Sequence, residues 1–317
     1  MKTKLKQFRA KAGMSQVEVA KTVGVTQPNY QRWESGSAPI PDAKLKTLAK
    51  VLKTTPDAIL GRHPPIEASL YDPKASDELS YYGEVAIHFC GGGASLLLSI
   101  TESELNRLHS ALQEDVAFVT VSSLSNQTVS IRTKAIADLY FSSEAYDDYG
   151  PEHGTYEDHL DVQMPDTRDW EIVEALSDES EDLEDFSPAD VKRVRERIMI
   201  TEEQYKMLLA DGRIKSDDLE KERAKNQEKT DRIIRLATHI VYQLSNGKKR
   251  CVWINDEYAI YNAFYDLTEF DGGDPADNMI RVAAEGGHRT IFINKSALDY
   301  VSIPTHRYEA GAAETLG

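Results

Sequence analysis

Residues 13–36 read GMSQVEVAKTVGVTQPNYQRWESG and decide the fold of the N-terminal part of the chain. Ser15 is well suited to cap a helix, and Gly24 is a natural stop about two turns later. Thr26 is placed to cap the next helix. That helix accommodates Pro28 in its first turn because the proline nitrogen needs no helical partner there. The stretch therefore predicts two short helices joined by a tight turn.

The second helix of this pair has an apolar face and a polar face. Tyr30 and Trp33 stand three residues apart and are predicted to point inward. The outer face carries side chains that read bases, since glutamine pairs with adenine and arginine with guanine in the major groove. These outward residues are Gln27, Pro28, Gln31 and Arg32. The tight turn and the polar second helix are typical of a helix-turn-helix.

Further helices are predicted on both sides of the pair. Leu5 and Phe8 stand at helical spacing in a first helix, and Thr55 begins a last short one that ends at Gly61. Apolar positions of the second helix are Val17, Ala20 and Val23, and those of the fourth are Leu45, Leu48, Ala49 and Leu52. Residues 1–62 are therefore expected to form an all-α domain of five helices.

Residues 4 to 61 resemble the Cro/C1 (XRE) helix-turn-helix family. The matching pieces are Gly13 to Gln16, Ala20, Gly24 to Thr26, Trp33 to Gly36, and Leu45 to Leu60 with Pro56. The resemblance implies that Gln16 contacts a phosphate and that Arg9 and Glu34 form a structural ion pair. It also implies a set of DNA-binding residues: Gln16, Thr26, Gln27, Pro28, Asn29, Gln31, Arg32, Ser35 and Ser37.

Charge is distributed unevenly along the chain, whose formal net charge is −16. Residues 1–62 carry twelve basic and four acidic side chains, whereas residues 144–190 carry eighteen acidic side chains and one basic one, Arg168. A basic module on an acidic body indicates nucleic-acid binding by the module. Two interpretations of the acidic stretch remain open: a solubilising linker, or a competitor of DNA phosphate for the basic head.

The N-terminal domain departs from the family pattern at two points. Pro28 stands where a polar side chain is usual, and Tyr30 and Trp33 are bulkier than the usual aliphatic residues, so the operator sequence stays open. A domain that kept the scaffold but now binds a protein is the alternative. The excess of basic residues and the polar outer face favour DNA binding. A domain that binds only a protein does not need a surface that attracts phosphate.

Beyond a proline-containing linker at 63–80, two stretches of the chain resemble each other. Residues 81–143 and 238–308 each read as strand, strand, helix, strand, strand. Their closing pieces align without a gap, TVSIRTKAIADLYF at 128–141 over TIFINKSALDYVSI at 290–303. We therefore expect a multidomain protein, in which an α+β body made of two copies of a β-β-α-β-β module follows the helical domain. Each copy is small for a core of its own, so the copies should pack on each other or on a second chain.

The remaining segments are predicted as connectors. Residues 144–186 are expected to form an acidic linker, residues 187–237 a helical connector that begins at Ser187, and residues 309–317 a tail. Cys90 and Cys251 lie far apart in strand-like sequence and are expected to be buried small hydrophobic residues.

Motifs for catalysis and for cofactors are weak or missing. His153 and His159 lie among acidic residues, but their spacing matches no established metal site, and DGGDPADN at 271–278 lacks the alternation of an EF-hand. No phosphate-binding GxxxxGK[ST] occurs, and no nucleophile stands beside a histidine in the sequence. We expect no enzyme activity, no metal and no cofactor.

The sequence thus predicts a cytoplasmic, sequence-specific DNA-binding regulator. By family analogy we expect repression, with a homodimer or higher homo-oligomer on a palindromic operator. The duplicated body would dimerise or sense an effector. The alternative is a DNA-tethered adaptor whose α+β body docks a partner protein. RNA binding by the body is a third hypothesis, against which its excess of acids argues. No apolar run is long enough to span a membrane.

Overall fold

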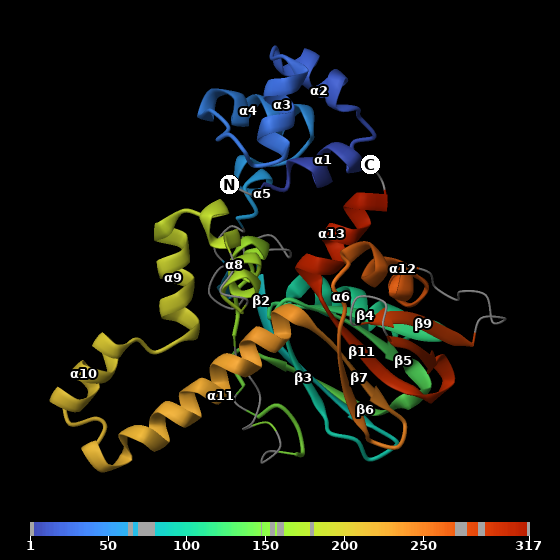
Figure 1. The fold of residues 1–317 in the computed structure, drawn as a ribbon. Coiled ribbons are helices and arrows are strands. Elements are labelled where there is room, and N and C mark those ends of the chain that lie inside the picture. Colours follow the sequence, from blue (N-terminus) through green and yellow to red (C-terminus); the bar gives the residue numbers. More distant parts are fainter. Residues whose placement is uncertain are drawn as a thin grey trace.

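A helical N-terminal region lies on a mixed α/β body with several sheets (Figure 1). The computed structural model describes residues 3–62, 66–68, 80–146, 148–152, 156, 162–177, 181–269, 278–284 and 289–315. Figure 1 shows the N-terminal helices in blue on one side of the body, and the C-terminal helix in red running up to them.

The N-terminal region has the five expected helices. They are α1 (Leu5–Lys11), α2 (Gln16–Val23), α3 (Gln27–Glu34), α4 (Asp42–Val51) and α5 (Pro56–Ile59). Their shared core buries Tyr30 and Leu48 completely. One expected core position is wrong: Val17 is 55% exposed and Val19 is buried. The period of 3.6 residues places Val19, with Ala20 and Val23, on the inner side of α2.

The first sheet of the body contains β2 (Ser80–Phe89) between β3 (Leu96–Thr101) and β6 (Ile136–Ser143), all antiparallel. Helix α6 (Glu102–Ala111) follows β3 and covers the buried face of this sheet. A short strand β1 (Glu67–Ala68) pairs with β2 in parallel, within the segment predicted as a linker.

The second sheet contains strands from both halves of the body. Its order is β4 (Phe118–Ser123), β5 (Gln127–Arg132), β11 (Leu298–Pro304), β7 (His239–Leu244) and β8 (Lys249–Trp253). Helix α12 (Glu257–Thr268) packs on it, and β9 (Met279–Ala284) pairs with β10 (Arg289–Asn294) in a separate ribbon. The hairpin of β4 and β5 therefore joins strands that are far away in the sequence.

Each half of the body shows the same order of elements. Two strands, a helix and two strands are followed by a 3-10 turn, η1 (Thr133–Ala135) or η5 (Lys295–Ala297), and by one further strand. That last strand, β6 or β11, extends the predicted five-element order. In both halves it pairs with the first strand, β2 or β7.

The acidic segment 144–186 differs from the predicted linker in its C-terminal part. There α8 (Thr167–Ser177) buries Trp170, Ile172 and Val173 in a core shared with later helices. The linker was predicted from the many acidic residues of the segment, and a count of charge does not reveal an apolar face. The later elements are η2 (Glu181–Asp185), α9 (Pro188–Ile198), α10 (Glu202–Ala210), η3 (Ser216–Asp218) and α11 (Leu219–Thr238).

The C-terminal segment is a helix, α13 (Thr305–Thr315), where a tail was predicted from residue 309. Tyr308 and Ala313 are buried. Gly311 allows α13 to approach α12 closely, because a Cβ at this position would lie 2.0 Å from the carbonyl oxygen of Glu257. Helix α13 also contacts α1 and α8, so it links the N-terminal region to the body.

The prediction of two buried cysteines is wrong, since Cys90 and Cys251 are both exposed. Cys90 directly follows the last residue of β2, and Cys251 lies in β8, an outer strand of the second sheet. An outer strand has no neighbour on one side, so strand-like sequence alone does not ensure burial. In the part of the chain that the structure describes, no helix is long and apolar enough to cross a membrane.

Candidate DNA-binding interface

Helix α2 is stabilised at both of its ends, and its second end leads into the turn before α3. Ser15 and Glu18 form a capping box in which each side chain bonds the backbone N–H of the other residue. Gly24 ends the helix in the left-handed conformation, with φ of 71°. Lys44 of α4 donates from Nζ to the carbonyl oxygen of Val23 at 2.7 Å. This lysine satisfies a carbonyl that the helix end leaves open, and it fixes the start of α3.

Helix α3 presents the predicted polar face to the outside. Tyr30 and Trp33 are buried, at 0% and 7% exposure, as their spacing predicted. The outward residues that are exposed are Thr26, Gln27, Pro28, Asn29, Gln31 and Arg32. Gln16, the expected phosphate contact, lies half-buried at the first position of α2. In Figure 1, α2 and α3 lie on the side of the N-terminal region that faces away from the body.

Two of the predicted DNA contacts also close the end of α3. The hydroxyl oxygens of Ser35 and Ser37 lie 2.9 Å apart, and both hydroxyls donate to the carbonyl oxygen of Arg32. Both residues are exposed. Thr26 at the other end makes no side-chain capping bond to α3. The two serines therefore stabilise the end of α3. The sequence had predicted a role in DNA binding only for them.

The predicted pair of Arg9 and Glu34 is present in the structure. Nη2 of Arg9 lies 2.9 Å from Oε1 of Glu34, and Arg9 Nη1 donates to the carbonyl oxygen of Met14 at 2.9 Å. Burial and the nearby Glu34 carboxylate raise the pKa of Tyr30 above its ordinary value. The pair thus ties α1 to the end of α3 from the inner side of the domain.

Many basic side chains of the N-terminal region lie at its surface. The exposed ones are Lys11, Lys21, Arg32, Lys46, Lys50, Lys53 and Arg62. Arg9 and Lys44 instead hold the domain together through short-range contacts, and Lys4 pairs with Glu171 of the body. The exposed cations provide a surface suited to the phosphates of DNA.

The N-terminal region is joined to the body through α8. Nζ of Lys4 lies 2.7 Å from Oε1 of Glu171, and the backbone N–H of Arg168 donates to the carbonyl oxygen of Gly61 at 3.4 Å. Gly61 has φ of 70°, and a Cβ there would lie 3.2 Å from Cβ of Arg168. Helix α8 comes from the acidic segment. One of its carboxylates therefore binds the head at this junction, while α3 lies on the far side (Figure 1).

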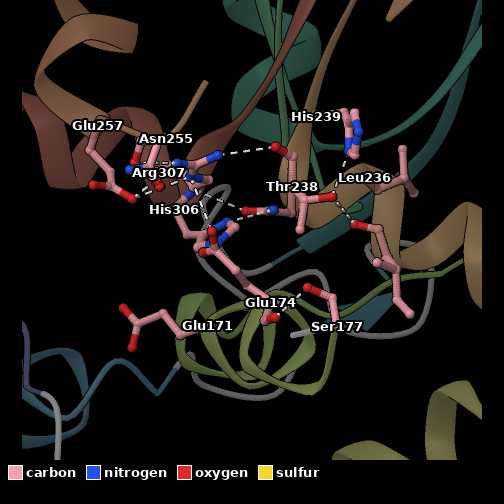
Figure 2. A network of polar contacts seen from close by, with 12 residues as sticks. Glu171, Glu174, Ser177, Leu236, Thr238, His239, Asn255, Glu257, His306 and Arg307 are labelled. Atoms are coloured by element: carbon pink, nitrogen blue, oxygen red, sulfur yellow. Dashed lines mark hydrogen bonds and ion pairs between the residues drawn. The ribbon is translucent and has the colours of Figure 1, made fainter. Parts of the chain in front are cut away.

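Next to the junction, α13 and α8 share a buried polar network (Figure 2). Glu174 of α8 lies 3.0 Å from Nε2 of His306 and 3.2 Å from Nε of Arg307. Arg307 also reaches Glu257 of α12 at 3.2 Å and donates to the carbonyl oxygen of Thr238 at 3.0 Å. None of these residues was predicted as a site residue. They come from segments far apart in the sequence, so no spacing signals the cluster.

A second polar cluster lies on the first sheet. Nδ1 of His88 contacts the carboxylate of Asp138, and its Nε2 lies 2.6 Å from the hydroxyl of Tyr156. Within the described ranges, no group of three histidine, cysteine or acidic residues is arranged to hold a metal ion. His153, His159 and residues 271–277, the weak metal candidates of the sequence, lie outside the described residues.

Comparison with known proteins identifies the N-terminal region alone. No curated protein and no solved structure matches the chain. Residues 5–59 match the family model described as helix-turn-helix, nearly the same span as the resemblance noted above. With the capped turn and the exposed face of α3, this match identifies the N-terminal region as a helix-turn-helix domain of the Cro/C1 (XRE) type.

Proposed function

We propose that the protein is a sequence-specific transcriptional repressor that binds a palindromic operator as a homo-oligomer. The observation that carries the proposal is the exposed polar face of α3, whose inner face packs against α2 in the shared core of the domain. In this proposal Gln27 and Arg32 bind adenine and guanine edges, and Gln16 binds a backbone phosphate. The protein acts in this proposal by binding and not by catalysis.

The test is DNA binding by the full-length protein across a salt series. Fragments from upstream of its own gene and duplexes selected from a random library are the DNA ligands. The Gln27→Ala, Arg32→Ala double variant should bind the selected site at least about 30-fold more weakly, since each lost base contact costs about 1 to 3 kcal/mol. Binding of random DNA should change less, because phosphate contacts dominate it.

A matched control changes the same residue types on the body. Gln227 and Arg235 are both exposed on α11, far from the helix-turn-helix domain in the sequence. The Gln227→Ala, Arg235→Ala variant should bind the selected site like the wild type. Equal loss in both double variants, or no sequence preference in the selection, would refute base reading by α3.

A second candidate function is a DNA-tethered adaptor. Helix α10 and the first part of α11 project away from the sheets (Figure 1), and Met207 of α10 is 58% exposed. In this reading the projecting arm docks a partner protein. Replacement of residues 200–228 by a short glycine linker should then abolish regulation in cells and leave operator binding in vitro intact. Regulation that survives the replacement would exclude the arm as a docking site.

A further inference from the structure

Aligned positions in the two halves of the body carry the same elements. Where TVSIRTKAIADLYF is aligned with TIFINKSALDYVSI, β5 and β10 occupy the same aligned positions. The 3-10 turns η1 and η5 also coincide, and β6 and β11 start at the same position. A contact made by one element of a pair can therefore be compared directly with that of its counterpart.

Strand β5 of the first half pairs with β11 of the second half. The register places Ser130 opposite Val301 and Ile131 opposite Tyr300. The hydroxyl of Ser130 also donates to the carbonyl oxygen of Leu267 at the end of α12, at 3.0 Å. Phe118 of β4 packs against the core of the second half. The hairpin of β4 and β5 is thus docked on the other half of the body.

The counterpart hairpin lacks such a docking site within the described part of the chain. Strand β10 pairs with β9 alone, and β6 pairs with β2 alone. Arg132 is opposite Phe118, and its aligned residue Asn294 is opposite Met279, so Met279 corresponds to Phe118. Phe292 corresponds to Ser130. Met279 is 51% exposed and Phe292 is 63% exposed, whereas Ser130 is fully buried.

The two strands that would accept a hairpin differ in the same way. All residues of β11 are buried, between β5 and β7. In β6 the residues Ala137, Asp138 and Tyr140 are exposed. Each chain therefore offers one hairpin edge, on β10, and one accepting edge, on β6. Exposed strand edges with apolar side chains are sites of strand addition.

We propose that β10 of one chain pairs in antiparallel fashion with β6 of a second copy of this chain. The register follows that of β5 and β11, so Phe292 lies opposite Leu139 and Ile293 lies opposite Asp138. Met279 and Phe292 then become covered by the first half of the neighbouring chain, as within one chain Phe118 is half-buried against the second half and Ser130 is fully buried. Because the two edges differ, the contact is head-to-tail, and it closes when the chains form a ring. The inference does not depend on DNA binding.

The first test is the mass of the full-length protein in solution without DNA, by size exclusion with light scattering. The wild type should show a multiple of the 35.5 kDa chain. The Met279→Lys, Phe292→Lys variant should show a single chain, with an unchanged circular dichroism spectrum. Met207→Lys changes an exposed apolar residue of α10 and should leave the oligomer intact. A single-chain wild type, or an oligomer that survives in the double variant, would overturn the proposal.

The second test fixes the register and does not require the lysine variant to fold. Leu139→Cys and Phe292→Cys are made in separate chains that carry Cys90→Ser and Cys251→Ser. After mixing and mild oxidation the two chains should form a disulfide-linked dimer, since opposite residues of paired strands have the required separation. The control replaces Leu139→Cys by Tyr146→Cys, an exposed position that follows β6. No cross-link, or equal cross-linking of the control, would reject the pairing of β10 with β6.

Discussion

The guanidinium of Arg9 in α1 binds the carboxylate of Glu34 at the end of α3, with Nη2 and Oε1 2.9 Å apart. The two side chains are 10% and 4% exposed, so water screens the pair little. The pair connects α1 to α3 across 25 residues of sequence. The pair thus helps to fix the orientation of α3 relative to α1.

Loss of this pair should loosen the helix-turn-helix domain. Glu34→Gln leaves the Arg9 charge without its partner, and we expect a loss of about 3 kcal/mol in local stability. The double variant Arg9→Met, Glu34→Gln should lose less than the sum of the single variants, because it leaves no lone charge. Hydrogen exchange of residues 5–59 measures these free energies. If the stability lost in the double variant equals the sum of the losses in the two single variants, the two residues act independently.

Gly61→Ala should weaken the junction between the head and α8. A residue with a side chain is strained at φ of 70°, and its Cβ would lie 3.2 Å from Cβ of Arg168. Gly13→Ala is the control, because Gly13 has φ of 64° but no atom within 4 Å of the added Cβ. Strain should cost each variant about 1 to 2 kcal/mol, and Gly61→Ala about 1 kcal/mol more. Urea unfolding measures the loss of stability in both variants. Equal losses would mean that the contact between the new Cβ and Arg168 adds no cost.

Arg307→Met should destabilise the body strongly. Arg307 is 3% exposed and holds Glu174 and Glu257 from two different helices. Removal of the buried cation takes a partner from two half-buried carboxylates and the donor from the carbonyl oxygen of Thr238, at a cost of about 3 kcal/mol. Arg223→Met breaks the more exposed pair with Glu202 and should cost less than about 1 kcal/mol. Urea unfolding of both variants tests the prediction, and similar losses would contradict it.

Both cysteines should react in the folded protein. Cys90 and Cys251 are exposed, so iodoacetamide should modify two thiols per chain without denaturant. Mass spectrometry of the intact chain counts the adducts, and the Cys90→Ser and Cys251→Ser variants should each lose one. A chain that accepts label only in urea would contradict the exposure of these residues.

Local signals made the helix-turn-helix domain predictable. The capping residues Ser15 and Thr55, the stop at Gly24 and the spacing of Tyr30 and Trp33 all act within a few residues of sequence. Val17 shows the limit of such reasoning, because it was predicted to lie in the core and is exposed. In a short helix, a small error in the repeat assigns a residue to the wrong face. In the body, the repeated pattern predicted two strands, a helix and two strands in each half, but it missed the last strand, β6 or β11, and the pairing of strands.

Features that depend on long-range contacts were missed or misjudged. Helix α8 reads as an acidic linker because acidic residues dominate the segment around it, yet packing against α9 and α11 buries its apolar face. Arg307 has no motif around it and gains its role only where α8, α12 and α13 meet. Exposure of Cys251 follows from the outer position of β8 in the sheet.

The sequence by itself determined the helices of the N-terminal domain, its outward polar face and its basic charge, and it indicated a repeated pattern of strands and helices in the body. These depend on capping, periodicity and composition, which act over one or two helical turns. Tertiary structure alone decided that β5 pairs with β11, that Lys4 meets Glu171, and that Met279 and Phe292 are left exposed. Such contacts join residues far apart in the chain, so they depend on the shape of the folded body and not on neighbouring residues.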